Sequence, residues 1–272
     1  MENADKQPVT GSEALLKALA AEGVDTIFGY PGGQIMPVYD RLYDYADRLR
    51  HILVRHEQGA IHAAQGYARV TGKPGVVIVT SGPGATNVIT GVADAMTDST
   101  PVVVISGQVA SAALGTDAFQ EADIIGLTGP ITKWNYQIRR AEDVAWAVAR
   151  AFYIASTGRP GPVVLDFTKD AQVGLTDFEF RKCSFIRSYV PELPVPMEEV
   201  ARAAELIDKA ERPMVVYGQG VILGGAEKAL ADFIEKGDIP AASTLLGLAA
   251  LPSSSRLYQG MIGMHGNVAP NI

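Results

Sequence analysis

The stretch GVVIVTSGPGATNVITGVADAMTDSTPVVVIS, residues 75–106, contains the pattern that decides the fold. Two apolar runs, at 75–80 and 101–106, flank a segment whose apolar residues recur at helical spacing. A continuous apolar run, without polar alternation, is typical of a strand that is buried on both faces of a parallel sheet. The stretch therefore predicts a strand, a crossover helix and a second, parallel strand.

Apolar runs of the same kind recur at 26–30, 51–55 and 161–167, with helical patterns between them. The series predicts an α/β domain with a doubly wound parallel sheet over about residues 8–172. The next segment, 173–196, is charged and then proline-rich, which predicts a linker.

Residues 197–272 show helix and strand patterns again and predict the start of a second α/β domain. Only two or three strand–helix elements are present there, too few for a closed core. We therefore expect the second domain to be incomplete and the chain to be the front part of a longer protein.

Composition narrows the class of protein. A chain of 272 residues with 47% hydrophobic residues can bury a sizeable core. The net charge of -7 and the scattered basic residues disfavour nucleic acid as a partner. Cys183 is the single cysteine, so an internal disulfide is excluded. The N-terminus is polar and no apolar run reaches membrane-spanning length, so we expect a cytoplasmic protein with no membrane partner.

Ligands of open parallel sheets bind at the carboxyl ends of the strands, so the strand-to-helix junctions are the candidate site. Gly32 and Gly33 follow the first predicted strand, TSGPGATN (80–87) follows the third, and Glu57 begins a helix pattern. The glycines fit a turn with positive φ as well as a ligand contact. Glu57 fits a helix start favoured by the macrodipole as well as a catalytic acid. The local pattern by itself favours the structural explanation in both cases.

Two other patterns fail as motifs. His56 and Glu57 look like the start of a zinc-binding HExxH, but the next histidine is His62, which points to another side of the helix. Gly218 and Gly220 fit the start of a dinucleotide loop, but Leu223 stands at the third glycine position. We predict neither a metal site nor a Rossmann loop in this chain.

Taken together, the junctions resemble a known family. FGYPGG, RHEQGA, GYARVTGKPGVVIVTSGPGATN, GTDAFQEAD, TKWN and GRPGPVVLDFTKD occur in the order and spacing of the thiamine diphosphate (ThDP) enzymes, in particular the large subunits of acetolactate synthases. The resemblance extends from about Thr10 to Asn271. It implies a pyrimidine-binding domain at 8–172 and part of a middle, FAD-binding domain at 197–272. The resemblance also implies that the Mg²⁺ ligands lie in a C-terminal domain, which we expect to follow outside these residues.

The resemblance implies decarboxylation of pyruvate and carboligation to a second 2-ketoacid, giving 2-acetolactate or 2-aceto-2-hydroxybutyrate. Glu57 matches the glutamate that hydrogen-bonds N1′ of the cofactor's aminopyrimidine and relays a proton. Gly33 matches the glycine beside the reacting carbon, and Gln120 matches a side chain that reaches into the active site. The remaining matches are ThDP-loop residues and substrate-channel residues: Pro83, Gly84 and Asn87 for the former, Phe119 and Lys169 for the latter.

The resemblance also implies structural FAD. The matching positions are Arg159, Gly218, Gly220, Thr244, Leu245, Gly263, Met264, His265 and Gly266. Arg159 also fits a surface charge, and the glycines also fit simple turns. As partners, the resemblance implies a homodimer or homotetramer with the ThDP site between subunits, and a regulatory small subunit.

Three alternatives stay open at this point. Catabolic acetolactate synthases share the first domain and lack FAD. Another ThDP decarboxylase or oxidase, such as a pyruvate oxidase, uses similar junctions. A third possibility is that these residues are a non-catalytic fragment for subunit interaction, and we expect the chain to be inactive on its own.

Overall fold

The structure is a computed structural model and describes residues 7–271. The chain forms two compact units, with the boundary between Leu193 and Pro194. The boundary falls inside the segment 173–196 that the sequence predicts to be a linker. Each unit is described below by itself.

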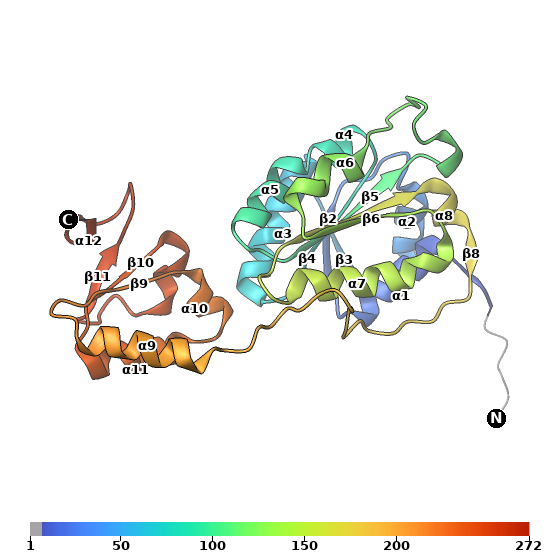
Figure 1. Cartoon of the computed structure of the whole chain (residues 1–272). Helices are drawn as coiled ribbons and strands as arrows, with labels where there is room; N and C mark the ends of the chain where they lie inside the picture. Colours follow the sequence, from blue (N-terminus) through green and yellow to red (C-terminus); the bar gives the residue numbers. More distant parts are fainter. Residues whose placement is uncertain (1–6, 272) are drawn as a thin grey trace. The chain divides into compact units, whose positions relative to one another are not determined.

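The first unit is built on a six-stranded parallel sheet (Figure 1) with the strand order β3-β2-β4-β5-β7-β6. This confirms the predicted α/β class with a parallel sheet. The strands are β2 (Thr26–Gly29), β3 (Arg50–Leu53), β4 (Gly75–Val79), β5 (Val102–Gln108), β6 (Trp134–Ile138) and β7 (Pro162–Thr168).

The apolar runs form the central strands because both of their faces are buried. Every residue of β4, β5 and β7 is buried. Alternate residues join different cores: Val76 and Ile78 belong to one cluster, and Val77 and Val79 to the other. Apolar side chains are therefore stabilising on both faces of these strands, which explains why their apolar runs show no regular polar alternation.

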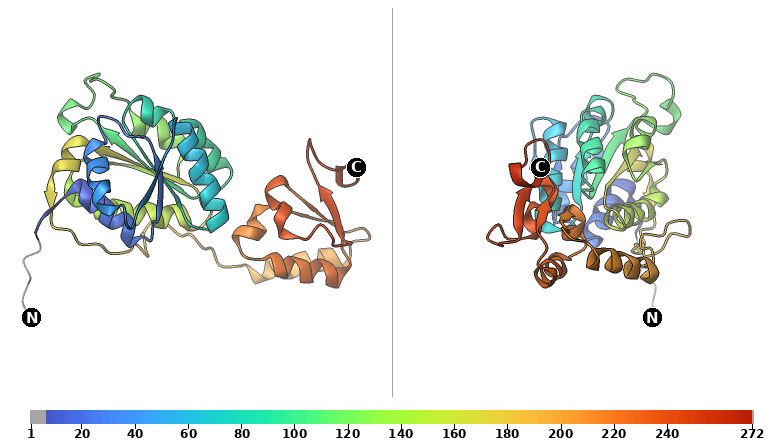
Figure 2. Two further views of the ribbon diagram at one scale, coloured as in Figure 1. Left: turned by 180° about the vertical axis from the view of Figure 1, so that it is seen from behind. Right: turned by 60° about the vertical axis from the view of Figure 1, so that its left-hand side comes forward.

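Helices cover both faces of this sheet, as Figures 1 and 2 show. On one face lie α1 (Gly11–Ala21), α2 (Met36–Leu42), α7 (Val144–Ser156) and α8 (Lys169–Val173). On the other face lie α3 (Glu57–Thr71), α4 (Pro83–Thr86), α5 (Ile89–Thr97) and α6 (Ile124–Thr128). Short 3-10 turns follow α2, β5, α6 and β6: η1 (Tyr43–Tyr45), η2 (Ser111–Ala113), η3 (Gly129–Ile131) and η4 (Ala141–Asp143).

The sequence analysis did not predict one strand of this sheet, β6. β6 lies at the edge, pairs only with β7, and is half-buried at four of its five positions. Its aromatic residues pack at the margin of the larger core cluster, where the rings of Trp134 and Tyr136 stack with centroids 5.5 Å apart. An edge strand of this kind has no continuous apolar run, so its sequence does not look like that of β4 or β5.

The chain that follows β7 belongs to the first unit as far as Leu193. β8 (Leu175–Thr176) pairs antiparallel with β1 (Val9–Thr10). Phe178, Phe180 and Tyr189 pack against the larger core cluster. The first part of the predicted linker segment therefore packs on this unit. Isolated aromatic side chains among polar residues hold it there.

The second unit contains a three-stranded parallel sheet with the order β11-β10-β9. Its strands are β9 (Val215–Tyr217), β10 (Ala241–Ser243) and β11 (Tyr258–Met261), and its helices are α9 (Met197–Asp208), α10 (Gln219–Leu223), α11 (Glu227–Gly237), η5 (Leu245–Ala250) and α12 (Val268–Asn271). Its core cluster is small: Tyr217, Ile234, Ala241, Ala250, Leu251 and Leu257. No residue of α9 is buried. In residues 7–271, no helix has both the length and the apolar character needed to cross a membrane.

Candidate functional site

The candidate site lies along the carboxyl edge of the six-stranded sheet. Glu57 follows β3, Gly32 and Gly33 follow β2, and Pro83, Gly84 and Asn87 follow β4. The segment with Phe119 and Gln120 follows β5, and Lys169 follows β7 directly. Because the strands are parallel, all of these residues emerge at the same edge.

Glu57 is the first residue of α3. The helix begins there because the side chain of His56 caps it: Nδ1 accepts a hydrogen bond of 3.1 Å from the backbone N–H of Gln58. The helix dipole favours a carboxylate at this position, as the sequence indicates. This local arrangement fixes where Glu57 leaves the backbone but not what its carboxylate contacts.

Asn87 contacts that carboxylate from the next junction. Its side-chain Nδ2 donates a hydrogen bond of 2.8 Å to Oε2 of Glu57. Within the described part of the chain, Oε1 of Glu57 has no hydrogen-bond partner. The carboxylate is half-buried and held by one oxygen, so the second oxygen remains available to a donor group of a ligand.

Two glycines of the candidate site, Gly84 and Gly32, are required by close packing. A Cβ at Gly84 would lie 2.7 Å from Cγ2 of Thr80 and 3.5 Å from Oε1 of Glu57. A Cβ at Gly32 would lie 2.5 Å from Cγ2 of the same threonine. Neither Gly32 nor Gly33 has a positive φ, so the interpretation of this pair as a left-handed turn is wrong. At Gly33 a Cβ would meet nothing within 4 Å, so its backbone faces open space.

Three side chains fix the loop after β2. Oγ1 of Thr80 accepts a hydrogen bond of 3.2 Å from the backbone N–H of Gln34. Lys169 donates from Nζ to the carbonyl of Gly33 at 2.6 Å, and Gln172 donates from Nε2 to the carbonyl of Gln34 at 2.7 Å. Burial lowers the pKa of Lys169. The structure thus ties Lys169 to Gly33, two positions that the sequence analysis placed in one active site.

The segment after β5 approaches the loop after β4 through its backbone. A Cβ at Gly82, where φ is +56°, would lie 2.6 Å from the carbonyl oxygen of Gln120. The carboxylate of Glu121 accepts hydrogen bonds from the backbone N–H groups of Gly115, Thr116 and Ala118, which lowers its pKa. Phe119, at the tip of this segment, is 83% exposed.

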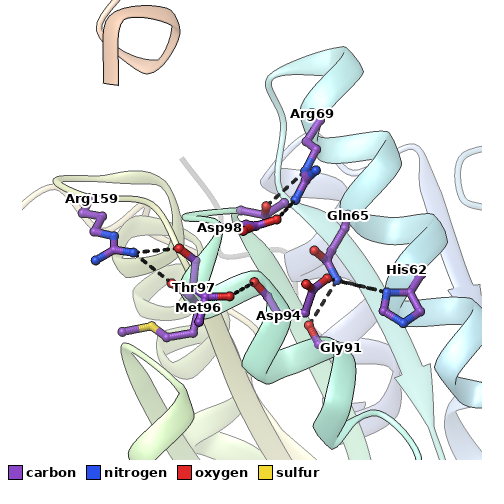
Figure 3. A network of polar contacts seen from close by, with 10 residues as sticks. His62, Gln65, Arg69, Gly91, Asp94, Met96, Thr97, Asp98 and Arg159 are labelled. Atoms are coloured by element: carbon purple, nitrogen blue, oxygen red, sulfur yellow. Dashed lines mark hydrogen bonds and ion pairs between the residues drawn. The ribbon is translucent and has the colours of Figure 1, made fainter. Parts of the chain in front are cut away.

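Arg159 holds the end of α5. Its Nε donates to Oγ of Ser99 at 2.7 Å, and Nη2 donates to the carbonyls of Thr97 at 2.9 Å and Met96 at 3.3 Å. Figure 3 shows the guanidinium directed at these carbonyls. Helices leave such carbonyls without partners at their carboxyl ends, so Arg159 has a structural contact in the first unit.

The helix that Glu57 begins, α3, packs closely against α5. Figure 3 shows Gln65 of α3 directed at Gly91 of α5. Gln65 is only 4% exposed, and its Nε2 donates to the carbonyl of Gly91 at 3.1 Å. A Cβ at Gly91 would lie 2.2 Å from the side chain of Ile61. The two helices therefore approach closely, which positions the junctions that precede them.

The other predicted FAD residues lie at the carboxyl edge of the second sheet. Gly218 and Gly220 follow β9, Thr244 and Leu245 follow β10, and residues 263–266 follow β11. The backbone N–H of Thr244 donates to the carbonyl of Tyr217 at 2.8 Å, and a Cβ at Gly218 would lie 3.1 Å from Oγ1 of Thr244. Met264 is 93% exposed and Gly263 has φ +109°.

Asp166 is a buried carboxyl group that the sequence analysis missed. It lies on β7 and accepts hydrogen bonds from Ser106 at 2.9 Å, Gln108 at 3.2 Å and Gln137 at 2.8 Å. Burial raises its pKa to about 6, against the opposing effect of these donors. Thr80 was missed too, because a threonine at the end of an apolar strand gives no signal of the glycines that pack on it. In residues 7–271, no three His, Cys, Asp or Glu residues are grouped so that they could hold a metal ion.

Comparison with known proteins matches both units to domains of one enzyme family. Residues 9–127 match the family of the thiamine pyrophosphate enzyme, N-terminal TPP binding domain, and residues 200–271 match that of the thiamine pyrophosphate enzyme, central domain. The acetolactate synthase of Mycobacterium bovis is 49% identical over 263 residues, which are 97% of this chain and 42% of that protein.

Two further relatives show the same relation. The acetolactate synthase isozyme 2 large subunit of Escherichia coli is 48% identical over 97% of this chain and 47% of its own length. The acetolactate synthase large subunit of Lactococcus lactis is 45% identical over 98% of this chain and 46% of its own length. The chain thus spans less than half the length of these relatives. With both of its units matched by domains of one enzyme family, and with Glu57 at the expected junction, the chain belongs to the thiamine pyrophosphate enzymes.

Proposed function

We propose that this chain is part of an acetolactate synthase catalytic subunit. The reaction joins a decarboxylated pyruvate to a second 2-ketoacid and gives 2-acetolactate or 2-aceto-2-hydroxybutyrate. One observation carries the proposal most directly: a half-buried glutamate whose Oε2 is held by Asn87 and whose Oε1 is unpartnered in the described structure, beside a glycine cradle.

The residues present fit the aminopyrimidine end of ThDP. A side chain at Gly84 would fill the space next to Oε1 of Glu57, so glycine keeps this space open. Glu57 would bind N1′ of the ring and hold or move a proton there, while Pro83, Gly84 and Asn87 would border the ring. When bound, ThDP supplies the carbanion chemistry that decarboxylation and carboligation need. Its diphosphate and Mg²⁺ would be held by residues outside these 272.

The remaining residues would position the substrates. Gly33, whose backbone faces open space and whose carbonyl is held by Lys169, would border the reacting carbon. Gln120 would reach the same region from the segment after β5, and Phe119 and Lys169 would line the approach for the 2-ketoacid. A partner subunit would cover this exposed edge in a homodimer or homotetramer, and the large-subunit names of the relatives support a regulatory small subunit.

For the second unit we propose structural FAD. The support is that Gly218, Gly220, Thr244, Leu245 and residues 263–266 share one sheet edge where backbone groups are accessible. Arg159 would contact the flavin in addition to its contacts with α5. We also propose a cytoplasmic location, because a water-soluble 2-ketoacid is the substrate.

The test uses the full-length enzyme with Glu57→Gln, which keeps the size of the side chain and the bond to Asn87 but cannot accept a proton. We expect loss of most activity and slow exchange of the cofactor's C2 proton, with ThDP still bound. Normal proton exchange in this variant would contradict the role of Glu57. Product analysis with pyruvate separates the alternatives: acetyl phosphate or acetaldehyde in place of acetolactate would indicate another ThDP decarboxylase or oxidase. Acetolactate formed by the 272 residues alone would contradict their proposed dependence on other segments.

A further inference from the structure

A cavity of about 360 Å³ lies where α7 meets the segment that follows β8. Its volume is within the range of about 300–1,000 Å³ that is common for small-ligand pockets. None of its lining residues belongs to the candidate thiamine or FAD residues. They are Trp146, Ala149, Arg150, Glu179, Arg181, Cys183 and Phe185.

Arg150 is the unusual residue of this cavity. Its guanidinium carbon lies 5.4 Å from the ring centroid of Trp134 and 5.4 Å from that of Trp146. The side chain is half-buried and its Nε is fully buried. Within residues 7–271, Arg150 makes no hydrogen bond or ion pair. A guanidinium has five N–H donors, so a partly desolvated arginine without acceptors favours the binding of an anion.

The other charges of the cavity leave this positive charge uncompensated. Arg181 donates to Oε1 of Glu179 from Nη2 at 2.7 Å and from Nε at 3.0 Å, so these two opposite charges pair with each other. The walls beside them are aromatic. The exposed fraction of Trp146 is 49% and that of Phe185 is 75%, so both rings can still bury surface against a ligand.

We propose that this cavity is a binding site for a small carboxylate that carries an aromatic ring. The carboxylate binds the guanidinium of Arg150, and the ring packs on Trp146 and Phe185. The site is independent of the proposed synthase reaction, because its residues are not those of the thiamine site. Its test needs no turnover.

The test titrates benzoate, and separately its neutral analogue benzamide, into the intact protein and follows tryptophan fluorescence. The chain contains two tryptophans, and both contact Arg150. The variant Trp146→Phe identifies the signal that comes from the cavity. We expect saturable binding of benzoate, with benzamide weaker by about tenfold or more because it lacks the charge. Equal affinities for the two probes, or no saturation, would overturn the proposal.

Variants assign the site to Arg150. Arg150→Met keeps the apolar stem and should weaken benzoate binding about tenfold or more. The matched control is Arg48→Met, next to β3 at the other edge of the sheet, and it should bind benzoate like the parent protein. Unchanged affinity in Arg150→Met would overturn the site. An acidic peptide that binds where benzoate does not would show a protein partner instead.

Discussion

Asn87 donates a hydrogen bond of 2.8 Å to Oε2 of Glu57, from a position 30 residues further along the chain. The two residues follow different strands, β4 and β3, and meet because these strands end at one edge of the sheet. The bond leaves Oε1 without a partner in the described residues and so available to a ligand. In the proposed mechanism, Asn87 would position Glu57 without taking part in proton transfer itself.

Asn87→Ala should lower kcat of the full-length enzyme by about tenfold with little change in KM, because the carboxylate loses the bond that orients it. Asn87→Asp should lower kcat further, because a second carboxylate cannot donate this hydrogen bond and repels the carboxylate of Glu57. Thr86→Val, on the exposed side of the same turn, is the control. Parent-like kcat in both Asn87 variants would contradict the positioning role.

Gly84→Ala should lower the free energy of unfolding by about 1–3 kcal/mol, because its Cβ would lie 2.7 Å from Cγ2 of Thr80. Adding Thr80→Ser removes that methyl group and keeps Oγ1 for Gln34, so the double variant should recover stability. Gly33→Ala is the matched control because nothing lies within 4 Å of its added Cβ, and its unfolding should be unchanged. Urea denaturation measures all three. No recovery in the double variant would show that the clash is not the cause.

Asp166 predicts a pH dependence of stability. Burial raises its pKa in the folded state to about 6, above the ordinary value of 3.8, so the folded protein binds this proton more tightly than the unfolded chain does. The contribution is fully present below about pH 4 and is lost as the pH rises through about 6, with a size on the order of 2–3 kcal/mol. Asp166→Asn should remove this loss. Urea unfolding at several pH values checks it.

The control for this prediction is Asp25→Asn. The pKa of Asp25 is lowered to about 2, first of all by the hydrogen bond from Tyr67 and then by that from Lys73. The sign is opposite, because stability from this group is lost only as the pH falls from about 4 towards 2. Asp25→Asn should therefore leave the slope between pH 4 and 6 in place. A parent-like slope in Asp166→Asn would show that another group causes it.

Lys169→Met should loosen the loop after β2, since the bond from Nζ to the carbonyl of Gly33 is lost. Hydrogen exchange of residues 31–35 should become faster, and KM for the 2-ketoacid should rise more than kcat falls. Lys169→Arg keeps a donor and should restore part of the protection. Unchanged exchange in Lys169→Met would indicate that Gln172 and Thr80 hold the loop without it.

Arg159→Met separates a structural role from a flavin contact. Loss of the bonds to Met96, Thr97 and Ser99 should lower the free energy of unfolding by about 1 kcal/mol, measured without any cofactor. Flavin retained by the full-length variant, measured by absorbance, then reports the proposed second contact. Full stability together with loss of flavin would reverse our assignment of its main role.

Much of the first unit follows from the sequence because its signals are local. β4, β5 and β7 are buried at every position and consist mostly of apolar residues, as expected for central strands of a parallel sheet that is covered on both faces. Glu57 at a helix start also follows from a local preference, and the helix does begin there. β6 did not follow, because a partly covered edge strand lacks the continuous apolar run that marks the central strands.

The function of the glutamate was suggested by motifs, but its surroundings were decided by tertiary structure. No local pattern connects Asn87 to Glu57, Thr80 to Gly32, or Lys169 to Gly33. These pairs meet only when the parallel strands align their carboxyl ends. The sequence by itself determined the alternation of buried strands and helices, since burial and periodicity are properties of short segments. Which oxygen of Glu57 is held and which glycine cannot carry a Cβ depends on contacts between distant segments, so only the folded chain decides them.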